Sequence, residues 1–312
     1  MHLFPESGFD QSAITPVFLG VLLSWLFTET LGWVFVGLVV PGYLATLFWL
    51  DPRSACIDVM EAVLTYWVAR ALCEHLSRTG LTSRLFGRER FLAILVVSVL
   101  VRLALEGALI PLVLPHARWA YSIGLVVVPL AANACWKTGL VRGLFQNGVT
   151  TLLVYALLRW VLIAHTNLSL AGFHLSIESA AGIFLRSPHA YVLLLTGAIL
   201  AAVANVRYGW DYGGILIPAL VSLVVTTPVK FAATFLEAGV LVLLVGLLLR
   251  FTTLGTWNIE GPRRAVLFLS ADYVLRFTAA AALGHHLPGT EIVELSGLGY
   301  LLPSLLAVKV SQ

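Results

Sequence analysis

Long apolar stretches, one after another, restrict the fold of this chain more than any other feature. A helix that crosses a bilayer needs about 20 mostly apolar residues. Eleven segments reach or approach that length, namely 14–32, 35–50, 57–76, 91–114, 120–137, 145–164, 190–206, 212–226, 230–250, 265–284 and 297–310. Charged residues make up only 11% of the chain, against about 25% in soluble domains. The sequence therefore predicts an all-α integral membrane protein with about 10–11 transmembrane or re-entrant helices.

The basic residues are unevenly distributed between the two sides that these segments define. With the N-terminus outside, the cytoplasmic residues are Arg78, Arg84, Arg88, Arg90, Lys137, Arg142, Arg207, Arg250, Arg263, Arg264 and Lys309. Only Arg53, Arg118, Arg186 and Lys230 then lie outside. Cytoplasmic loops of membrane proteins carry an excess of Lys and Arg, so we predict this orientation. Segments 35–50 and 212–226 are short for a full crossing, and the topology changes if both are re-entrant.

A glycine followed a few residues later by a proline interrupts four of the apolar segments. These pairs are Gly37 and Pro41, Gly124 and Pro129, Gly214 and Pro218, and Gly299 and Pro303. Glycine adds backbone freedom and proline removes a hydrogen-bond donor, so both weaken a helix. Repeated broken segments in a membrane protein point to a central binding site, where helix N-termini can face an anion. Close helix packing through small residues is the alternative interpretation, and the two are compatible.

Two parts of the chain resemble each other. A shift of 177 residues places 31–37 on 208–214 and Pro41 on Pro218, and a shift of 174 places Arg102 on Arg276. We therefore predict a first membrane repeat at 1–164, a loop at 165–189 and a second repeat at 190–312. The second repeat lacks a counterpart of the helix at 145–164. Six spans separate the copies, so they should lie parallel in the membrane.

A weaker similarity lies inside the first copy. Tyr66 and Arg70 match Tyr155 and Arg159 at a shift of 89 residues, and Pro41 matches Pro129 at 88. Three spans separate these halves, which would give them opposite orientations. Inverted three-helix sub-repeats with broken helices are an architecture of transporters.

Ionisable residues inside membrane spans are costly and by default indicate function. They are Arg70, Arg102, Glu106, Arg159, Glu237, Asp272 and Arg276, with Glu29, Asp58 and Glu61 near span ends. Arg102 and Glu106, like Asp272 and Arg276, are four residues apart and should be neighbours on one helix face. Either such pairs neutralise each other and keep helices in register, or the residues line a path for an anion. The candidate path residues are Arg70, Arg102, Arg159, Arg276, Glu29, Glu106 and Asp272.

Basic loops recur at corresponding places in the two copies. They contain Arg84, Arg88 and Arg90 in the first copy and Arg263 and Arg264 in the second. Ordinary cytoplasmic positive charge explains them, but they could also dock a cytoplasmic partner. The cysteines and histidines show no metal-ligand spacing, and no hydrolytic triad, phosphate loop or dinucleotide fingerprint is present. We therefore predict no catalytic residues, metal or cofactor for this chain.

Several motifs resemble the small membrane subunit of poly-γ-glutamate synthase, the PgsC/CapC family. Residues 27–32, FTETLG, precede the nonapeptide 37–45, GLVVPGYLA, and residues 87–91, GRERF, lie where the family has a basic loop. Residues 124–133 and 136–140 resemble the family's second proline segment and the turn after it. The resemblance covers about 14–164, a whole family unit, and is looser over 190–312. Glu29 aligns with Val206 in the second copy, which departs from the motif.

The resemblance implies a non-catalytic, multi-pass subunit of the bacterial cytoplasmic membrane that helps to make and export a capsule-type polyanion. Its partners would be a Mur-ligase-like amide ligase, which uses ATP and Mg and joins glutamates through their γ-carboxylates, and further export subunits. Two alternatives remain. The chain could be a stand-alone secondary transporter for a small anion, with Glu106, Glu237 and Asp272 as proton sites, or a membrane scaffold for another glutamate-ligase-type enzyme.

Overall fold

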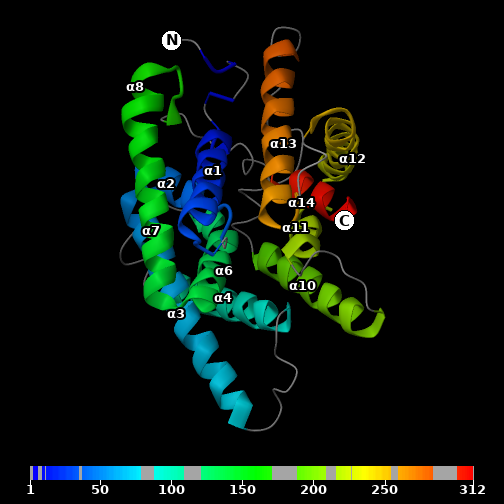
Figure 1. Ribbon diagram of the computed structural model, residues 1–312. Helices are drawn as coiled ribbons and strands as arrows, with labels where there is room; N and C mark the ends of the chain where they lie inside the picture. The colour runs from blue at the N-terminus through cyan, green and yellow to red at the C-terminus, as the bar shows by residue number, and fades with distance from the viewer. Residues whose placement is uncertain are drawn as a thin grey trace.

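All regular elements of the computed structural model are helices (Figure 1). The structure describes residues 3–5, 9–10, 12–34, 37–78, 88–108, 121–170, 188–208, 216–225, 227–253, 259–283 and 301–311. The first copy contains α1 (Ile14–Leu31), α2 (Val40–Leu50), α3 (Pro52–Arg78), α4 (Arg88–Ala108), α6 (Tyr121–Thr138), α7 (Leu140–Leu157), the π-helix η1 (Leu158–Leu162) and α8 (Ile163–His165). The second contains α10 (Pro188–Tyr208), α11 (Leu216–Val224), α12 (Pro228–Phe251), α13 (Pro262–Leu283) and α14 (Leu301–Val310).

The two copies pack their helices in the same way. In the first copy α1 contacts α2, α3 contacts α4 and α6, and α2 also contacts α3 and α6. In the second copy α10 contacts α11, α12 contacts α13 and α14, and α11 also contacts α12 and α14. The packing is therefore what a tandem duplication would give. Helix α7 packs on α1, α2 and α6 in the first copy, and the described residues of the second copy contain no equivalent helix.

The copies meet through a reciprocal pair of contacts. Helix α1 of the first copy packs on α13, and its counterpart α10 packs on α4, the counterpart of α13. Figure 1 shows both pairs, with α1 beside α13 and α4 beside α10. Because the same two surfaces are used in both directions, the interface has the form of a two-fold, self-complementary contact.

Aromatic side chains and one ion pair fix the direction of α1 against α13. Near the start of α1, the Phe18 ring stacks on Tyr273 at a centroid distance of 4.2 Å, and Phe9 lies 5.5 Å from both Tyr273 and Phe277. Near its end, Glu29 accepts two hydrogen bonds of 2.7 Å from Arg263. The start of α1 therefore contacts the later residue Tyr273 of α13, and the end of α1 contacts the earlier residue Arg263. The two helices are thus antiparallel.

Within the described ranges, four helices are long and apolar enough to cross a bilayer, at Ile14–Leu31, Leu140–His165, Pro228–Phe251 and Pro262–Ala282. The second of these passes without interruption through α7, η1 and α8. Helices α2 and α11, of 11 and 9 residues, would measure only about 17 and 14 Å at 1.5 Å per residue. A bilayer core is about 30 Å thick, so both segments have the short length expected from the sequence.

The Gly/Pro motifs take two forms among the described residues. Pro41 is the second residue of α2, at the start of that helix. The first N–H groups of a helix have no intrahelical acceptor, so proline costs little there. Pro129 instead lies inside α6, which also contains Gly124. Pro218 and Pro303 lie in α11 and α14, and the residues just before Leu216 and Leu301 lie outside the described residues. Gly37 adopts the positive φ of 73° in the turn before α2, whereas Gly214 and Gly299 lie outside the described residues.

The small residues also allow α1 and α2 to approach closely. A Cβ atom on Gly42 would lie 2.4 Å from Val17 Cα, and one on Gly20 would lie 2.6 Å from the Gly42 nitrogen. The equivalent helices of the second copy also approach closely, since a Cβ on Gly197 of α10 would lie 2.7 Å from Ser222 Oγ and 3.1 Å from the Pro218 carbonyl oxygen of α11. Small residues at such positions let membrane helices pack backbone to backbone.

Candidate functional site

Buried charges gather in two clusters, one in each copy. We call Asp58, Glu61 and Arg102 the first-copy cluster, and Glu237, Asp272 and Arg276 the second-copy cluster. Five of these side chains are buried, and the sixth, Glu237, is 16% exposed. Buried charges are costly unless they are paired, so each cluster is a place where the fold retains ionisable groups against a desolvation penalty.

The first-copy cluster joins α3 to α4. Asp58, Glu61 and Thr65 are spaced so that they share one face of α3, and all three are buried. Arg102 reaches this face from α4, with its Nη1 atom 3.8 Å from Glu61 Oε2. Arg102 is only 2% exposed, although arginine is rarely buried so completely. Arg102 therefore places a cation at the acidic face of α3.

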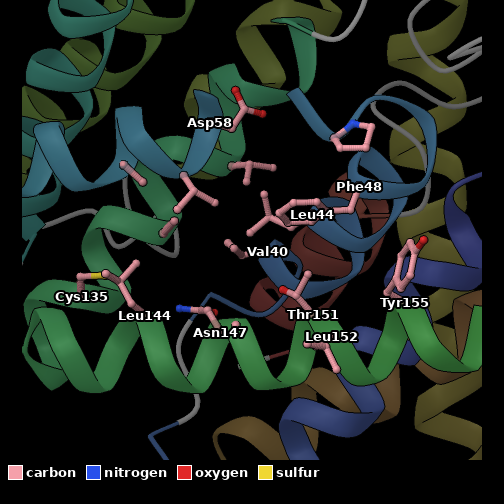
Figure 2. A pocket seen from close by; sticks show the side chains of 16 residues that line it. Val40, Leu44, Phe48, Asp58, Cys135, Leu144, Asn147, Thr151, Leu152 and Tyr155 are labelled. Atoms are coloured by element: carbon pink, nitrogen blue, oxygen red, sulfur yellow. The ribbon is translucent and has the colours of Figure 1, made fainter. Parts of the chain in front are cut away.

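A cavity of about 470 Å³ lies beside this cluster, with Asp58 in its wall. Figure 2 shows Asp58 from α3 on one side, Val40, Leu44 and Phe48 from α2, and Asn147 and Thr151 from α7 on the opposite side. Most of the lining is apolar; Asp58, Asn147, Thr151 and Tyr155 supply hydrogen-bonding groups.

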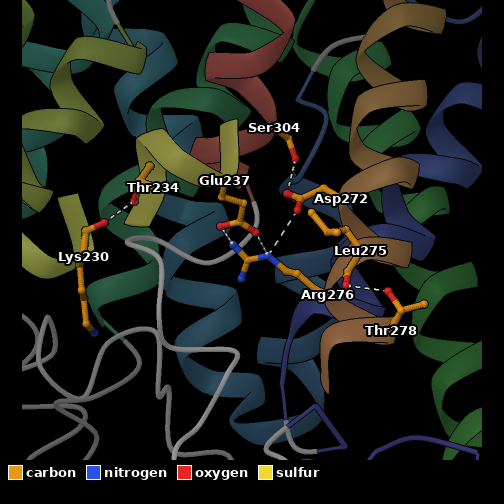
Figure 3. Close-up of polar contacts among 8 residues, drawn as sticks. All are labelled: Lys230, Thr234, Glu237, Asp272, Leu275, Arg276, Thr278 and Ser304. Atoms are coloured by element: carbon orange, nitrogen blue, oxygen red, sulfur yellow. Dashed lines mark hydrogen bonds and ion pairs between the residues drawn. The ribbon is translucent and has the colours of Figure 1, made fainter. Parts of the chain in front are cut away.

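The second-copy cluster is more tightly hydrogen-bonded (Figure 3). Arg276 Nε and Nη2 each lie 2.8 Å from one carboxylate oxygen of Glu237, which is a bidentate pair between α13 and α12. Arg276 Nε is also 3.5 Å from Asp272 Oδ1, one turn away on α13. Ser304 of α14 donates a hydrogen bond of 2.6 Å to Asp272 Oδ2. Three helices therefore meet at this cluster.

The clusters share one glutamate and one arginine at equivalent positions. Glu61 and Glu237 lie on the equivalent helices α3 and α12, and Arg102 and Arg276 lie on α4 and α13. The remaining acids are not equivalent, since Asp58 lies on α3 and Asp272 lies on α13. The conserved feature of the duplication is thus a glutamate–arginine pair between two helices.

This pair was missed in the sequence because spacing finds neighbours only within one helix. The expected contact between Asp272 and Arg276 is present, but each arginine also contacts a glutamate on another helix. The Glu106 side chain, expected beside Arg102, lies outside the described residues. The sequence did contain a signal for the pair. Glu61 matches Glu237 at a shift that lies between the 177 residues of the preceding match and the 174 residues of the Arg102–Arg276 match.

Arg70 and Arg159 lie apart from the clusters on exposed helix faces. Arg70 donates to Glu74 Oε1 at 2.9 Å and to the Tyr66 hydroxyl at 2.8 Å. Arg159 donates to the Tyr155 hydroxyl at 3.4 Å. The repeated Tyr-Arg spacing thus gives the same local contact twice, but it does not bring these arginines to Arg102 or Arg276.

Three of the five basic-loop residues have described side chains. Arg263 is paired with Glu29 and remains half-exposed, Arg90 lies 5.7 Å from the centroid of the Trp136 ring, and Arg264 donates to the Ser311 carbonyl. Arg84 and the Arg88 side chain lie outside the described residues. Glu29, predicted for the anion path, joins the two copies through Arg263.

Comparison with known proteins gives two matching regions. The family described as Capsule biosynthesis CapC matches residues 19–144 and 196–312. PGA biosynthesis protein CapC of Bacillus subtilis (strain 168) is 34% identical over 132 residues, which make up 42% of this chain and 83% of the relative. Capsule biosynthesis protein CapC of Bacillus anthracis is 33% identical over 133 residues, with the same coverages. Each relative is therefore about half as long as this chain. No solved structure matches it.

Proposed function

The chain belongs to the CapC family of capsule biosynthesis proteins, and from this premise we propose that it is the membrane subunit of a complex that makes and exports poly-γ-glutamate. A Mur-ligase-like amide ligase on the cytoplasmic side would supply the catalysis, with its own ATP and Mg. The half-exposed Arg263, together with Arg90 and Arg264, would contribute to the surface on which that ligase docks. The protein itself would guide the polyanion across the membrane.

The observation that carries this proposal is the glutamate–arginine pair that occurs once in each family-matched region. A γ-linked glutamate polymer keeps one free α-carboxylate per residue, and the guanidinium group binds carboxylates in a two-pronged manner. The Glu237 carboxylate already contacts the Arg276 guanidinium in this two-pronged manner. In the proposed mechanism, a polymer carboxylate exchanges with the resident glutamate, so that each arginine binds the passing chain without holding it permanently.

The first test measures incorporation of labelled glutamate, with ATP, into high-molecular-weight material by native membranes with and without this chain. We expect incorporation to require the chain and to return on re-expression. Full incorporation without the chain, together with normal secretion of polymer, would contradict the proposal. Full incorporation with polymer retained inside cells would restrict the role to export.

The second test removes both partners of each glutamate–arginine pair at once, so that neither partner is left without the other. Glu61→Met/Arg102→Met and Glu237→Met/Arg276→Met each replace an ion pair by apolar side chains of similar length, a change that folded proteins often tolerate. We expect at least a tenfold loss of secreted polymer, because about 1.4 kcal/mol of lost polymer binding corresponds to that factor. Arg250→Met, at the exposed end of α12, is the matched control. Normal secretion by both paired variants, at normal membrane levels, would exclude the arginine path.

A further inference from the structure

The cavity beside the first-copy cluster opens toward the side of the helix bundle. Its floor comes from α2 and α6, and its two walls come from α3 and α7. On the α7 wall, Leu152 is 67% exposed, and Gly148 is exposed as well. Helix α7 belongs to one of the four candidate membrane spans, so its exposed apolar residues face lipid. A hydrocarbon chain could therefore enter the cavity directly from the bilayer.

The size and lining of the cavity suit such a chain. Its volume of about 470 Å³ falls within the range of about 300–1,000 Å³ that is usual for small-molecule sites. Val40, Leu44 and Phe48 of α2 face Leu144 of α7 across it. An apolar pocket with a few placed polar groups is the usual form of a site that binds an amphiphile.

Two buried polar atoms lie in opposite walls and have no hydrogen-bond partner among the described residues. They are Asp58 Oδ2 on α3 and Thr151 Oγ1 on α7, and their residues are 3% and 5% exposed. Both line the cavity (Figure 2). Buried polar groups without a partner are rare in folded proteins and call for an explanation. A bound molecule that donates hydrogen bonds to both atoms would supply one.

The carboxyl group of Asp58 favours a cationic donor, because a hydrogen bond from an amine to a carboxylate is charge-assisted and about twice as strong as a neutral one. Asp58 lies six residues into α3, about 9 Å along the helix axis, so it lies close to one end of this helix. We propose that the cavity between α3 and α7 binds a membrane lipid, whose hydrocarbon chain fills the apolar part and whose amine head donates to Asp58 and Thr151.

The cavity lining contains neither Glu61 nor Arg102, so the lipid site is separate from the pair proposed to bind the polymer. The apolar walls would not hydrate the carboxylates of poly-γ-glutamate. The test is therefore a comparison of head groups on the purified full-length protein in detergent. The probes are a photoactivatable twelve-carbon alkylamine and the matching alcohol and carboxylic acid, with labelled peptides mapped by mass spectrometry. We expect the amine to label peptides of α2, α6 and α7 about tenfold more than the acid does.

Three variants separate this site from general binding of amphiphiles. Leu152→Trp should fill the cavity entrance and abolish labelling of the lining peptides. Leu243→Trp is the control and should leave the labelling unchanged, because Leu243 lies on α12 outside the cavity lining and is 68% exposed. Asp58→Asn should reduce the preference for amine over alcohol to about onefold. Equal labelling of the two tryptophan variants would overturn the proposal. So would a preference for the acid probe, or an amine preference that survives Asp58→Asn.

Discussion

At the scale of single residues, Arg276 illustrates how this protein keeps a cation inside a bundle of apolar helices. Its guanidinium contacts both carboxylate oxygens of Glu237 and one of Asp272, and Asp272 is in turn held by Ser304. The hydrogen bonds replace part of the hydration that burial removes. Such a pair is strongly coupled, since neither partner is stable in this place without the other.

This coupling predicts different costs for single and paired substitutions. Arg276→Met leaves Glu237 and Asp272 buried without their cation, which should lower the free energy of unfolding by about 3–5 kcal/mol. Glu237→Met/Arg276→Met should cost clearly less, because Asp272 keeps its hydrogen bond from Ser304. Thermal unfolding of the purified protein in detergent, followed by intrinsic fluorescence, measures both. Equal losses in the two variants would show that the pair is not coupled.

At the scale of elements, the crossing of α1 and α2 depends on the absence of a side chain. Gly42→Ala would bring a Cβ atom to 2.4 Å from Val17 Cα and 2.6 Å from the Pro16 carbonyl oxygen, and both are backbone atoms that cannot move independently. The helices must separate, so we expect a loss of about 1–3 kcal/mol, as for other overpacked sites. Gly239→Ala on α12 is the control, since its Cβ would meet nothing within 4 Å.

Gly239→Ala should be neutral or stabilise the protein by up to about 1 kcal/mol, because alanine has the higher helix propensity. The readout is the unfolding midpoint of both variants under the same detergent conditions. If Gly42→Ala is as stable as Gly239→Ala, the backbone contact between α1 and α2 does not contribute to the fold.

The sequence predicted the elements better than it predicted their contacts. The lengths of the apolar segments predicted where the helices lie, because this signal is local in the sequence. Matches such as Arg102 with Arg276 predicted the duplication, because they recur at a nearly fixed offset along the chain. The role of the prolines could not be read in this way, since a proline in the first turn and one inside a helix look alike in sequence. Pro41 and Pro129 occupy these two situations. The Glu61–Arg102 pair depends on how α3 and α4 meet, which no spacing rule contains.

At the scale of the whole molecule, the reciprocal contacts of α1 with α13 and of α10 with α4 explain why two family units occur in one chain. A two-fold interface between identical units can be kept after a gene fusion, and each side is then free to diverge. Glu29 shows this divergence. It binds Arg263 at one interface, whereas its counterpart in the other copy is Val206.

The Glu29–Arg263 contact also predicts a result for membrane topology. The two residues touch, so cysteines placed at either position must react from the same side of the membrane, and the orientation predicted from the basic residues places that side in the cytoplasm. The background carries serine at Cys56, Cys73 and Cys135, which are all free. We expect an impermeant maleimide to label Glu29→Cys and Arg263→Cys only after the cells are permeabilised, and to label Arg53→Cys in intact cells. Labelling of Glu29→Cys and Arg263→Cys from opposite sides would overturn the interface between the copies, whereas labelling of both from outside would reverse only the orientation.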